Sequence, residues 1–186
     1  MKVICISGKS GVGKDLFASI LREHLEQSHD RKVLVIHYAD VLKFVCQKFF
    51  GWNGEKNKSG RTLLQYVGTD VVRAKDENFW VDFLVKMLTF FEDQWDVVLI
   101  PDARFPNEIE RMKALKYVSH VRVVRDNRKA LTEEQESHPS ETALDHYPCD
   151  LVVENNGTVQ DLVQFVEFSE ELHWIAECVP RQLTGR

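Results

Sequence analysis

The stretch VICISGKSGVGKDLFASIL (Val3–Leu21) decides the fold of this chain. Apolar residues typical of a strand lead into a glycine-rich turn, and the residues after the turn repeat with helical spacing. The turn has the spacing G-x-x-x-x-G-K from Gly8 to Lys14, which is typical of a loop that binds phosphate groups. The next position, where such a loop usually carries Ser or Thr, holds Asp15.

Glycines in this turn allow the backbone to approach a phosphate group closely, because they adopt torsion angles that side chains disfavour. Successive backbone amides and the N-terminus of the following helix attract negative charge, and Lys14 would bridge the terminal phosphates of a nucleotide. We therefore expect the loop to bind ATP, through Gly8, Gly11, Val12, Gly13, Lys14, Asp15 and Leu16.

The carboxylate of Asp15 needs a separate explanation. At about 4 Å from a phosphate oxygen it would be repelled by roughly 4 kcal/mol at an effective dielectric constant of about 20. A Mg²⁺ ion between the two groups reverses the sign, because this ion binds carboxylate and phosphate oxygens together. Asp15 would then bind the metal directly or through water. The alternative is simple stabilisation of the helix N-terminus, which contributes about 0.3–1 kcal/mol.

The composition is typical of a soluble globular chain with one domain. Its 186 residues are 44% hydrophobic and 28% charged, and the net charge is -5. Because the charge is negative, we expect neither nucleic acid nor a membrane as a partner. Four scattered cysteines indicate reduced thiols, and the N-terminal apolar run is short for a signal peptide, so we expect a cytoplasmic protein. A homodimer is left open.

Five short runs rich in Val and Ile are typical of strands buried on both faces; they are residues 2–7, 32–38, 95–101, 119–125 and 149–155. Helical patterns lie between most of them. One pattern carries an apolar stripe of Trp80, Phe83, Leu84, Met87, Leu88 and Phe91, and the C-terminal helix is expected to start at Thr158. This alternation predicts a single α/β domain over residues 1–186, with a five-stranded parallel sheet in a three-layer α/β/α arrangement.

A polar segment, residues 125–148, separates the fourth and fifth predicted strands. It contains no run of apolar residues like those of the strands. Its length and polarity are typical of a mobile lid over an active site. Ligands of such sheets bind beyond the carboxyl ends of the strands, which is where this segment begins.

The segment DVVLIPDARFPNEIER, residues 96–111, ends a predicted buried strand with two charged side chains. Asp102 would hold Mg²⁺ through water or bind a substrate hydroxyl, and Arg104 would clamp a phosphate with two hydrogen bonds. A plain polar turn is the alternative for both. Glu108 lies in the first turn of the next helix, where stabilisation of the helix terminus and contact with a ligand are both open.

A second group of polar residues follows one ridge of a predicted helix, four residues apart; it consists of Arg61, Gln65, Thr69 and Arg73. Such a ridge binds a phosphate or faces solvent, and spacing alone does not decide between the two. Trp80 would stack on a base or belong to the core, and Lys43 would contact a phosphate or lie on the surface. The seven histidines show no spacing typical of a ligand group, and no general base is evident. A phosphate acceptor needs no base, because its oxygen is already ionised at pH 7.

Several segments together resemble the phage-type deoxynucleoside monophosphate kinases. They are SGKSGVGKD, LLQYVGTDVV, FWVDFL, LIPDARFPNEIE, VRVVR and HPSETALDHYPCDLVVENNGTVQDL, and the resemblance extends over nearly the whole chain. The resemblance implies the P-loop nucleoside monophosphate kinase fold. It also implies Mg²⁺-dependent transfer of the ATP γ-phosphate to a deoxynucleoside monophosphate, giving the diphosphate and ADP, in a host cytoplasm if the source is a phage.

The matching positions imply donor and metal contacts at Gly11, Gly13, Lys14 and Asp15, and a metal contact at Asp102 is consistent with them. They imply acceptor contacts at Lys43, Arg61, Trp80, Asp102, Arg104 and Glu108. Gln65 and Arg73, from the same ridge as Arg61, are further candidate acceptor residues. Arg125 and Arg128 match the lid region, where they would stabilise the transferring phosphoryl group. The turn VENNG, which contains Asn155, resembles the loop that contacts the donor adenine.

Two departures from the family pattern concern the donor loop and the acceptor pocket. Leu16 stands where well-known members carry a Thr, and the region between Lys43 and Arg61 is short. The same GKD loop and DxR strand end resemble animal-type phosphomevalonate kinase, which is the alternative enzyme. A nucleotide-binding switch without transfer chemistry is a third reading, although NKSG (57–60) lacks the Asp of a GTPase base motif.

Overall fold

The computed structural model describes residues 1–55, 57–127 and 136–177 of the chain. Its centre is a five-stranded parallel sheet with the strand order β2-β3-β1-β4-β5. The strands are β1 (Lys2–Ser7), β2 (Val33–Val35), β3 (Val97–Ala103), β4 (Val118–Val124) and β5 (Leu151–Glu154). All five predicted strands are therefore confirmed, in a parallel sheet, as the alternating pattern requires.

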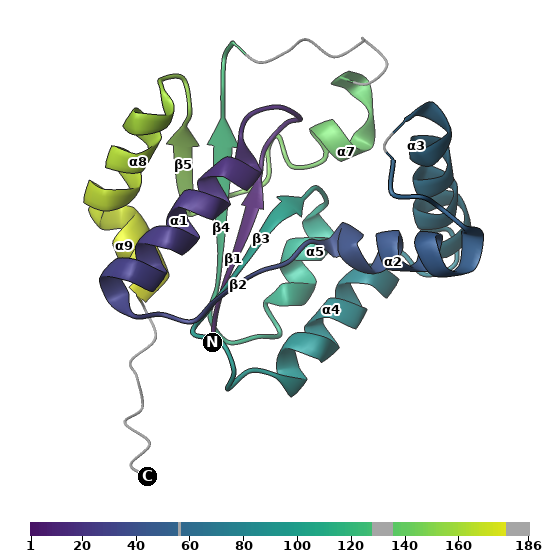
Figure 1. Cartoon of the computed structure of the whole chain (residues 1–186), viewed down its shortest axis with the longest axis horizontal. Helices are drawn as coiled ribbons and strands as arrows, with labels where there is room; N and C mark the ends of the chain where they lie inside the picture. The colour runs from purple at the N-terminus through teal and green to yellow at the C-terminus, as the bar shows by residue number, and fades with distance from the viewer. Residues whose placement is uncertain (56, 128–135, 178–186) are drawn as a thin grey trace.

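Helices cover both faces of the sheet (Figure 1). On one face lie α1 (Lys14–His29), α8 (Val159–Phe168) and α9 (Glu170–Glu177), which share one apolar core. On the other face lie α2 (Tyr38–Phe50), α4 (Phe79–Phe90) and α5 (Pro106–Met112) around a second core. Side chains of β1 alternate between these cores: Ile4 and Ile6 enter the first, and Val3 and Cys5 enter the second.

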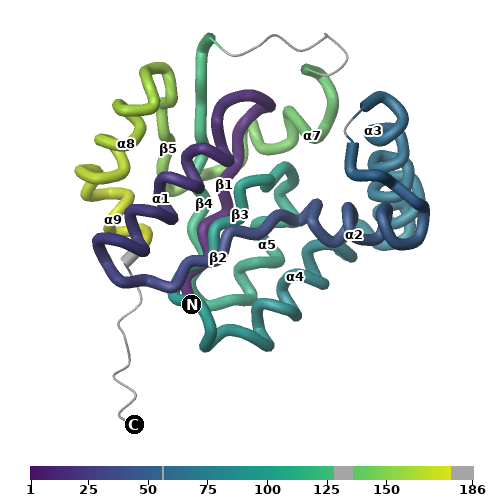
Figure 2. The backbone as a smooth tube through the Cα atoms, viewed as in Figure 1, coloured from purple at the N-terminus to yellow at the C-terminus, as the bar shows by residue number. Residues whose placement is uncertain are grey.

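A separate helical segment lies beside α2 (Figure 2). It consists of α3 (Lys58–Gln65) and a π-helix (Tyr66–Arg73), and it packs on α2 through a small core around Cys46, Trp52 and Val67. The π-helix places its hydrogen bonds five residues apart, so the four-residue ridge predicted over residues 61–73 is not continued in this form. Arg73 is turned to α5, while Arg61 stays exposed on α3.

Three details of the predicted elements were wrong. The second strand ends at Val35 instead of 38, because His37 already caps α2 and Asp102 binds the first amides of that helix. The buried stripe of α4 consists of Trp80, Val81, Leu84 and Leu88, and Phe83, Met87 and Phe91 are exposed. Thr158 does cap the C-terminal helix, but Ser169 ends α8, and α9 begins anew.

The phosphate loop between β1 and α1 lies beside the short helix α7 (Pro139–Thr142) in both views (Figures 1 and 2). The carboxyl ends of β1, β3 and β4 point toward the same end of the molecule, as in other parallel sheets. Among the described residues, no helix combines the length and hydropathy that a membrane crossing requires.

Candidate nucleotide site

The backbone of the phosphate loop has the torsion angles that only glycine adopts without strain. Gly8 has φ 140°, and a Cβ atom there would lie 2.2 Å from the Val123 carbonyl oxygen. Gly13 has φ 94°, and a Cβ atom there would meet the Asn155 side chain at 2.4 Å. The loop is therefore pressed against the ends of β4 and β5, and both glycines are required by space as well as by φ.

Asn155 supports this loop from the sheet side. Its side chain is buried, and its amide nitrogen donates to the Val12 carbonyl oxygen at 2.8 Å. The bond ties the loop to the end of β5. Contact between Asn155 and the donor adenine stays a prediction.

Lys14 is buried under the loop, with 8% of its surface exposed. Its Nζ donates to the carbonyl oxygens of Gly8 at 2.7 Å and Lys9 at 2.9 Å. Burial, together with the positive charge of Arg104, lowers the pKa of Lys14 to about 8. The ammonium is thus held inside the loop, where the terminal phosphates of a nucleotide would lie.

Asp15 projects outward from the first turn of α1, and 80% of its side chain is exposed. Its Oδ1 lies 2.9 Å from Nε2 of His37, a residue that the sequence pattern did not single out. His37 and Asp40 form the capping box of α2, and Asp40 also accepts a hydrogen bond from Lys43 at 2.8 Å. Asp15 and Lys43 are therefore connected through the start of α2.

Asp102 also lies at the start of α2. Its two carboxylate oxygens accept hydrogen bonds from the backbone amides of Tyr38 at 2.9 Å and Ala39 at 3.1 Å. Burial raises the pKa of Asp102, while these amide bonds oppose the rise. The Asp102 carboxylate therefore holds the N-terminus of α2 against the end of β3. Its contact with a metal ion or a substrate stays a prediction.

Arg104 and the phosphate loop hold one carboxylate between them. Oε2 of Glu141 accepts the backbone amide of Ser10 at 2.7 Å, and Oε1 accepts Nη1 of Arg104 at 2.5 Å. The Glu141 side chain is 7% exposed, and Arg104 also donates to the Ser140 carbonyl oxygen at 3.1 Å. The Ser10 amide and the Arg104 guanidinium therefore form an oxyanion site, a site for a negatively charged group. In this structure the carboxylate of Glu141 occupies that site.

A cavity of about 330 Å³ opens at this point. Its walls include Gly8 and Val12 of the loop and three arginines, Arg104, Arg122 and Arg125. Arg122, which the sequence pattern placed simply within a strand, donates to the carbonyl oxygens of Leu144, Asp145 and Tyr147. It therefore anchors the chain after α7 to β4. Arg128 lies outside the described residues, and the assignment of 125–148 as a lid stays a prediction.

Glu108 and Arg73 form an ion pair on the other side of Arg104. Oε1 of Glu108 lies 3.2 Å from Nη1 of Arg73, whose guanidinium also stacks on the Phe105 ring at 4.0 Å. Oε2 of Glu108 accepts the backbone amides of Arg104 and Phe105. Burial raises the pKa of Glu108, and these bonds oppose the rise. Glu108 thereby fixes the backbone that carries Arg104.

The remaining predicted acceptor residues lie farther from the cavity lining. Trp80 is 7% exposed, and its indole nitrogen donates to the Gly68 carbonyl oxygen at 3.2 Å, so it belongs to the core of α4. Gln65 and Arg61 are exposed on α3. Contact of these three residues with an acceptor stays a prediction.

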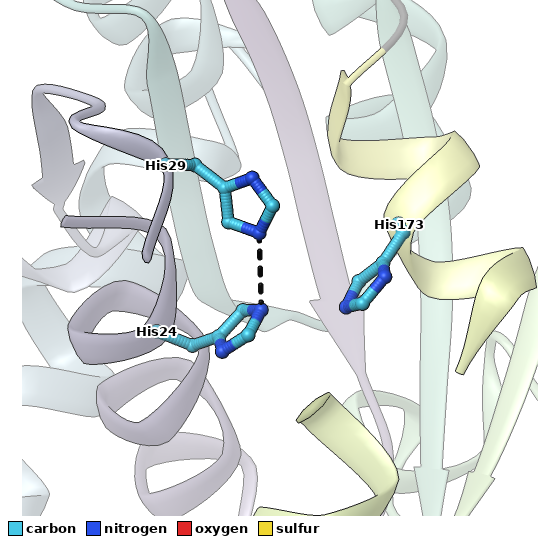
Figure 3. A group of neighbouring side chains, drawn as sticks. All are labelled: His24, His29 and His173. Atoms are coloured by element: carbon cyan, nitrogen blue, oxygen red, sulfur yellow. Dashed lines mark hydrogen bonds between the residues drawn. The ribbon is translucent and has the colours of Figure 1, made fainter. Parts of the chain in front are cut away.

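Three of the seven histidines, which show no ligand spacing in the sequence, lie close together in the structure. His24, His29 and His173 offer three ring nitrogens that all lie within 4.8 Å of one another (Figure 3). The sequence did not show this, because His173 is 144 positions from His29 and comes from another helix. The group lies apart from the phosphate loop and is taken up below.

A phosphate loop between the first strand and first helix of a parallel sheet is the arrangement of the P-loop fold. Solved structures share it: a Mycobacterium tuberculosis APS kinase in complex with AMPPNP and APS is 12% identical with a TM-score of 0.50, covering 89% of this chain and 95% of its own. A sugar kinase from Janibacter sp. HTCC2649 is 12% identical with a TM-score of 0.51, covering 88% and 91%.

Sequence comparison identifies the family. The profile of deoxynucleotide monophosphate kinases matches residues 26–166, and the chain belongs to this family. The deoxynucleotide monophosphate kinase of Enterobacteria phage T4 is 31% identical over 112 residues, which cover 59% of this chain and 44% of that protein. That of Escherichia phage RB69 is 30% identical over 132 residues, which cover 70% and 52%. The chain thus spans about half the length of these two relatives.

Proposed function

We propose that the protein transfers the γ-phosphoryl group of ATP to a deoxynucleoside monophosphate, giving the diphosphate and ADP. Family membership supports the class of reaction. The observation that carries the proposal is the carboxylate of Glu141, held between the Ser10 amide and the Arg104 guanidinium. Donors that hold a carboxylate in this way would also hold a phosphoryl oxygen, and they connect the donor loop with the predicted acceptor clamp.

The donor side of the reaction is the phosphate loop. The loop amides would bind the β- and γ-phosphates, and Lys14 would add a positive charge where these phosphates meet. The similar APS kinase forms a complex with AMPPNP, an ATP analogue, which is consistent with ATP as the donor here. Asn155 and Gly13 keep the loop in this shape.

The residues present fit a magnesium ion. Asp15 offers an exposed carboxylate at the start of α1, and carboxylate oxygens are ligands that Mg²⁺ prefers in kinase sites. His37 orients this carboxylate from the side. Asp102 would contribute through water, since both its oxygens already accept backbone amides. When bound, the ion would neutralise charge on the phosphate oxygens.

Arg104 would hold the transferring group between donor and acceptor, and Arg125, with Arg128 of the predicted lid, would add positive charge. An oxygen of the acceptor monophosphate forms a bond to the γ-phosphorus, and the bond from that phosphorus to the bridging oxygen of ADP breaks. The acceptor oxygen is already ionised at pH 7, so the chain needs no general base. The other acceptor residues we propose are Lys43, Arg61, Gln65, Arg73, Trp80, Asp102 and Glu108.

A panel of acceptors tests this proposal. ADP release from ATP and Mg²⁺ would be measured with each common deoxynucleoside and ribonucleoside monophosphate, with phosphomevalonate, and with no acceptor. We expect ADP release that depends on at least one deoxynucleoside monophosphate. Turnover with phosphomevalonate alone would replace the proposal by the other kinase. Binding of ATP without turnover for any acceptor would identify a nucleotide-binding protein that is not a kinase.

A further inference from the structure

We propose that His24, His29 and His173 form a binding site for a divalent transition metal ion, of which zinc is the first candidate (Figure 3). His24 and His29 come from the carboxyl-terminal part of α1, and His173 comes from α9. Imidazole nitrogens are typical ligands of zinc, copper and nickel, and three of them with one open position form a known zinc ligand set.

The distances suit such an ion. Nε2 of His24 and Nε2 of His29 lie 3.3 Å apart. Two nitrogens that bind zinc at 2.0–2.1 Å in a tetrahedron are separated by about 3.3 Å, so these two atoms already have the spacing of a bound pair. The third ring stacks on that of His24 with 5.2 Å between centroids. One of its ring nitrogens lies within 4.8 Å of ring nitrogens of both other histidines.

His173 has the supporting contact that a ligating histidine usually makes. Its Nε2 lies 2.9 Å from the Val166 carbonyl oxygen of α8. As the donor in this bond, Nε2 carries the proton, and the lone pair is then on Nδ1. A hydrogen bond from one ring nitrogen to a backbone carbonyl group is how proteins fix the tautomer of a metal-binding histidine.

The backbone beneath the three rings is held by the core. Leu25 beside His24 is 1% exposed, and Leu172 beside His173 is 0% exposed, both in the same apolar core. The rings themselves are half-buried, so an ion can reach them. His29 is the last residue of α1, where the partial negative charge of the helix terminus favours a cation. Two helices fixed by one core therefore present three ligands at a favourable terminus.

The site would lie apart from the phosphate loop and take no part in phosphoryl transfer. His24 follows Lys14 by ten positions on α1, which places the two about 15 Å apart along the helix axis. A bound ion would tie α9 to the helix that carries the phosphate loop. Binding would stabilise the folded chain by mass action, because the three ligands converge only after folding.

Calorimetric titration of Zn²⁺ into the full, untagged chain tests the inference. The buffer would contain a phosphine reductant to keep the thiols reduced and excess Mg²⁺ to occupy oxygen sites. We expect one Zn²⁺ per chain and a higher unfolding temperature with zinc. His24→Gln, His29→Gln and His173→Gln should each weaken binding at least about tenfold, since losing even an outer contact of a metal ligand costs about 10–100-fold.

His146→Gln is the matched control, because His146 is exposed and lies outside the group. This variant should bind zinc like the wild-type chain. The visible spectrum of the wild-type chain with Co²⁺ gives a second readout that needs no variant, and strong bands of tetrahedral coordination are expected. Absence of zinc binding by the wild-type chain, or equal binding by all three glutamine variants, would overturn the inference.

Discussion

Arg104 is the residue on which the proposed transfer depends most. Its guanidinium and the Ser10 amide both donate to the Glu141 carboxylate. Glu108 in turn accepts the backbone amide of Arg104 and so holds its backbone in place. A cation here would contribute chiefly when the γ-phosphoryl group is in transit, because it lies beside the donor loop and not within it. Binding of ATP and transfer should therefore respond differently to its removal.

We expect Arg104→Ala to lower kcat by about 100-fold or more, with the Kd for ATP changed only a fewfold. The acceptor-dependent rate and equilibrium binding of ATP would be measured separately. Arg111→Ala is the control, because Arg111 pairs with Asp82 on the surface and should leave both quantities unchanged. Unaltered turnover in Arg104→Ala would refute the clamp.

Lys14 predicts a dependence of ATP binding on pH. With a pKa of about 8, lowered by burial and by Arg104, the free protein loses the Lys14 proton as pH rises through 8. Phosphates bind the protonated form, so the Kd for ATP should rise above pH 8, by up to about tenfold per pH unit. Lys14→Arg should bind more weakly and without this dependence. A wild-type Kd that is constant from pH 7 to 9.5 would contradict the role.

At the scale of elements, the sequence predicted more of the phosphate loop than of the surroundings of Arg104. The phosphate loop could be predicted because its glycine spacing, the strand before it and the helix after it are all local features of the sequence. All five predicted strands were also found. The positions of Glu141 and His37 depend on where α7 and α2 pack, and local spacing carries no such signal. The π-helix is a further example, since it moved Arg73 away from the expected ridge.

Helix α7 supplies the occupant of the oxyanion site and should compete with phosphate. Glu141→Gln keeps the size of the side chain but removes its charge, so the Ser10 amide and Arg104 would be held less tightly. We expect ATP to bind about tenfold more tightly to this variant, a difference of about 1.4 kcal/mol. Glu110→Gln, at an exposed pair with Lys113, serves as control. Equal or weaker ATP binding by Glu141→Gln would exclude competition.

The end of β5 supports the loop through Asn155. Asn155→Ala would leave the buried Val12 carbonyl oxygen without this donor, which costs about 1–3 kcal/mol of unfolding free energy. ATP affinity should fall with it, because the loop amides lose their fixed directions. Asn156→Ala alters an exposed neighbour bonded to Asp126 and should cost much less. Urea unfolding and ATP titration of both variants check this, and equal stability of the two would refute the supporting role.

At the scale of the whole molecule, the helices on the two faces of the sheet position different candidate residues. One face holds α1, whose N-terminus carries the phosphate loop and whose C-terminal end carries the histidine group. The other face holds α2, α4 and α5, which position Asp102, Arg73 and Glu108. The proposed donor and acceptor sites would thus meet at the carboxyl edge of the sheet, between β1 and β3.

The fate of the γ-phosphate of ATP gives the sharpest test of this arrangement. ATP labelled in that phosphate would be incubated with Mg²⁺, the full chain and a mixture of the four common deoxynucleoside monophosphates, and the products separated. We expect the label in deoxynucleoside diphosphate, in amounts equal to the ADP formed, and its loss in Arg104→Ala. Label found only in inorganic phosphate, or remaining in ATP, would show that the chain does not perform the transfer.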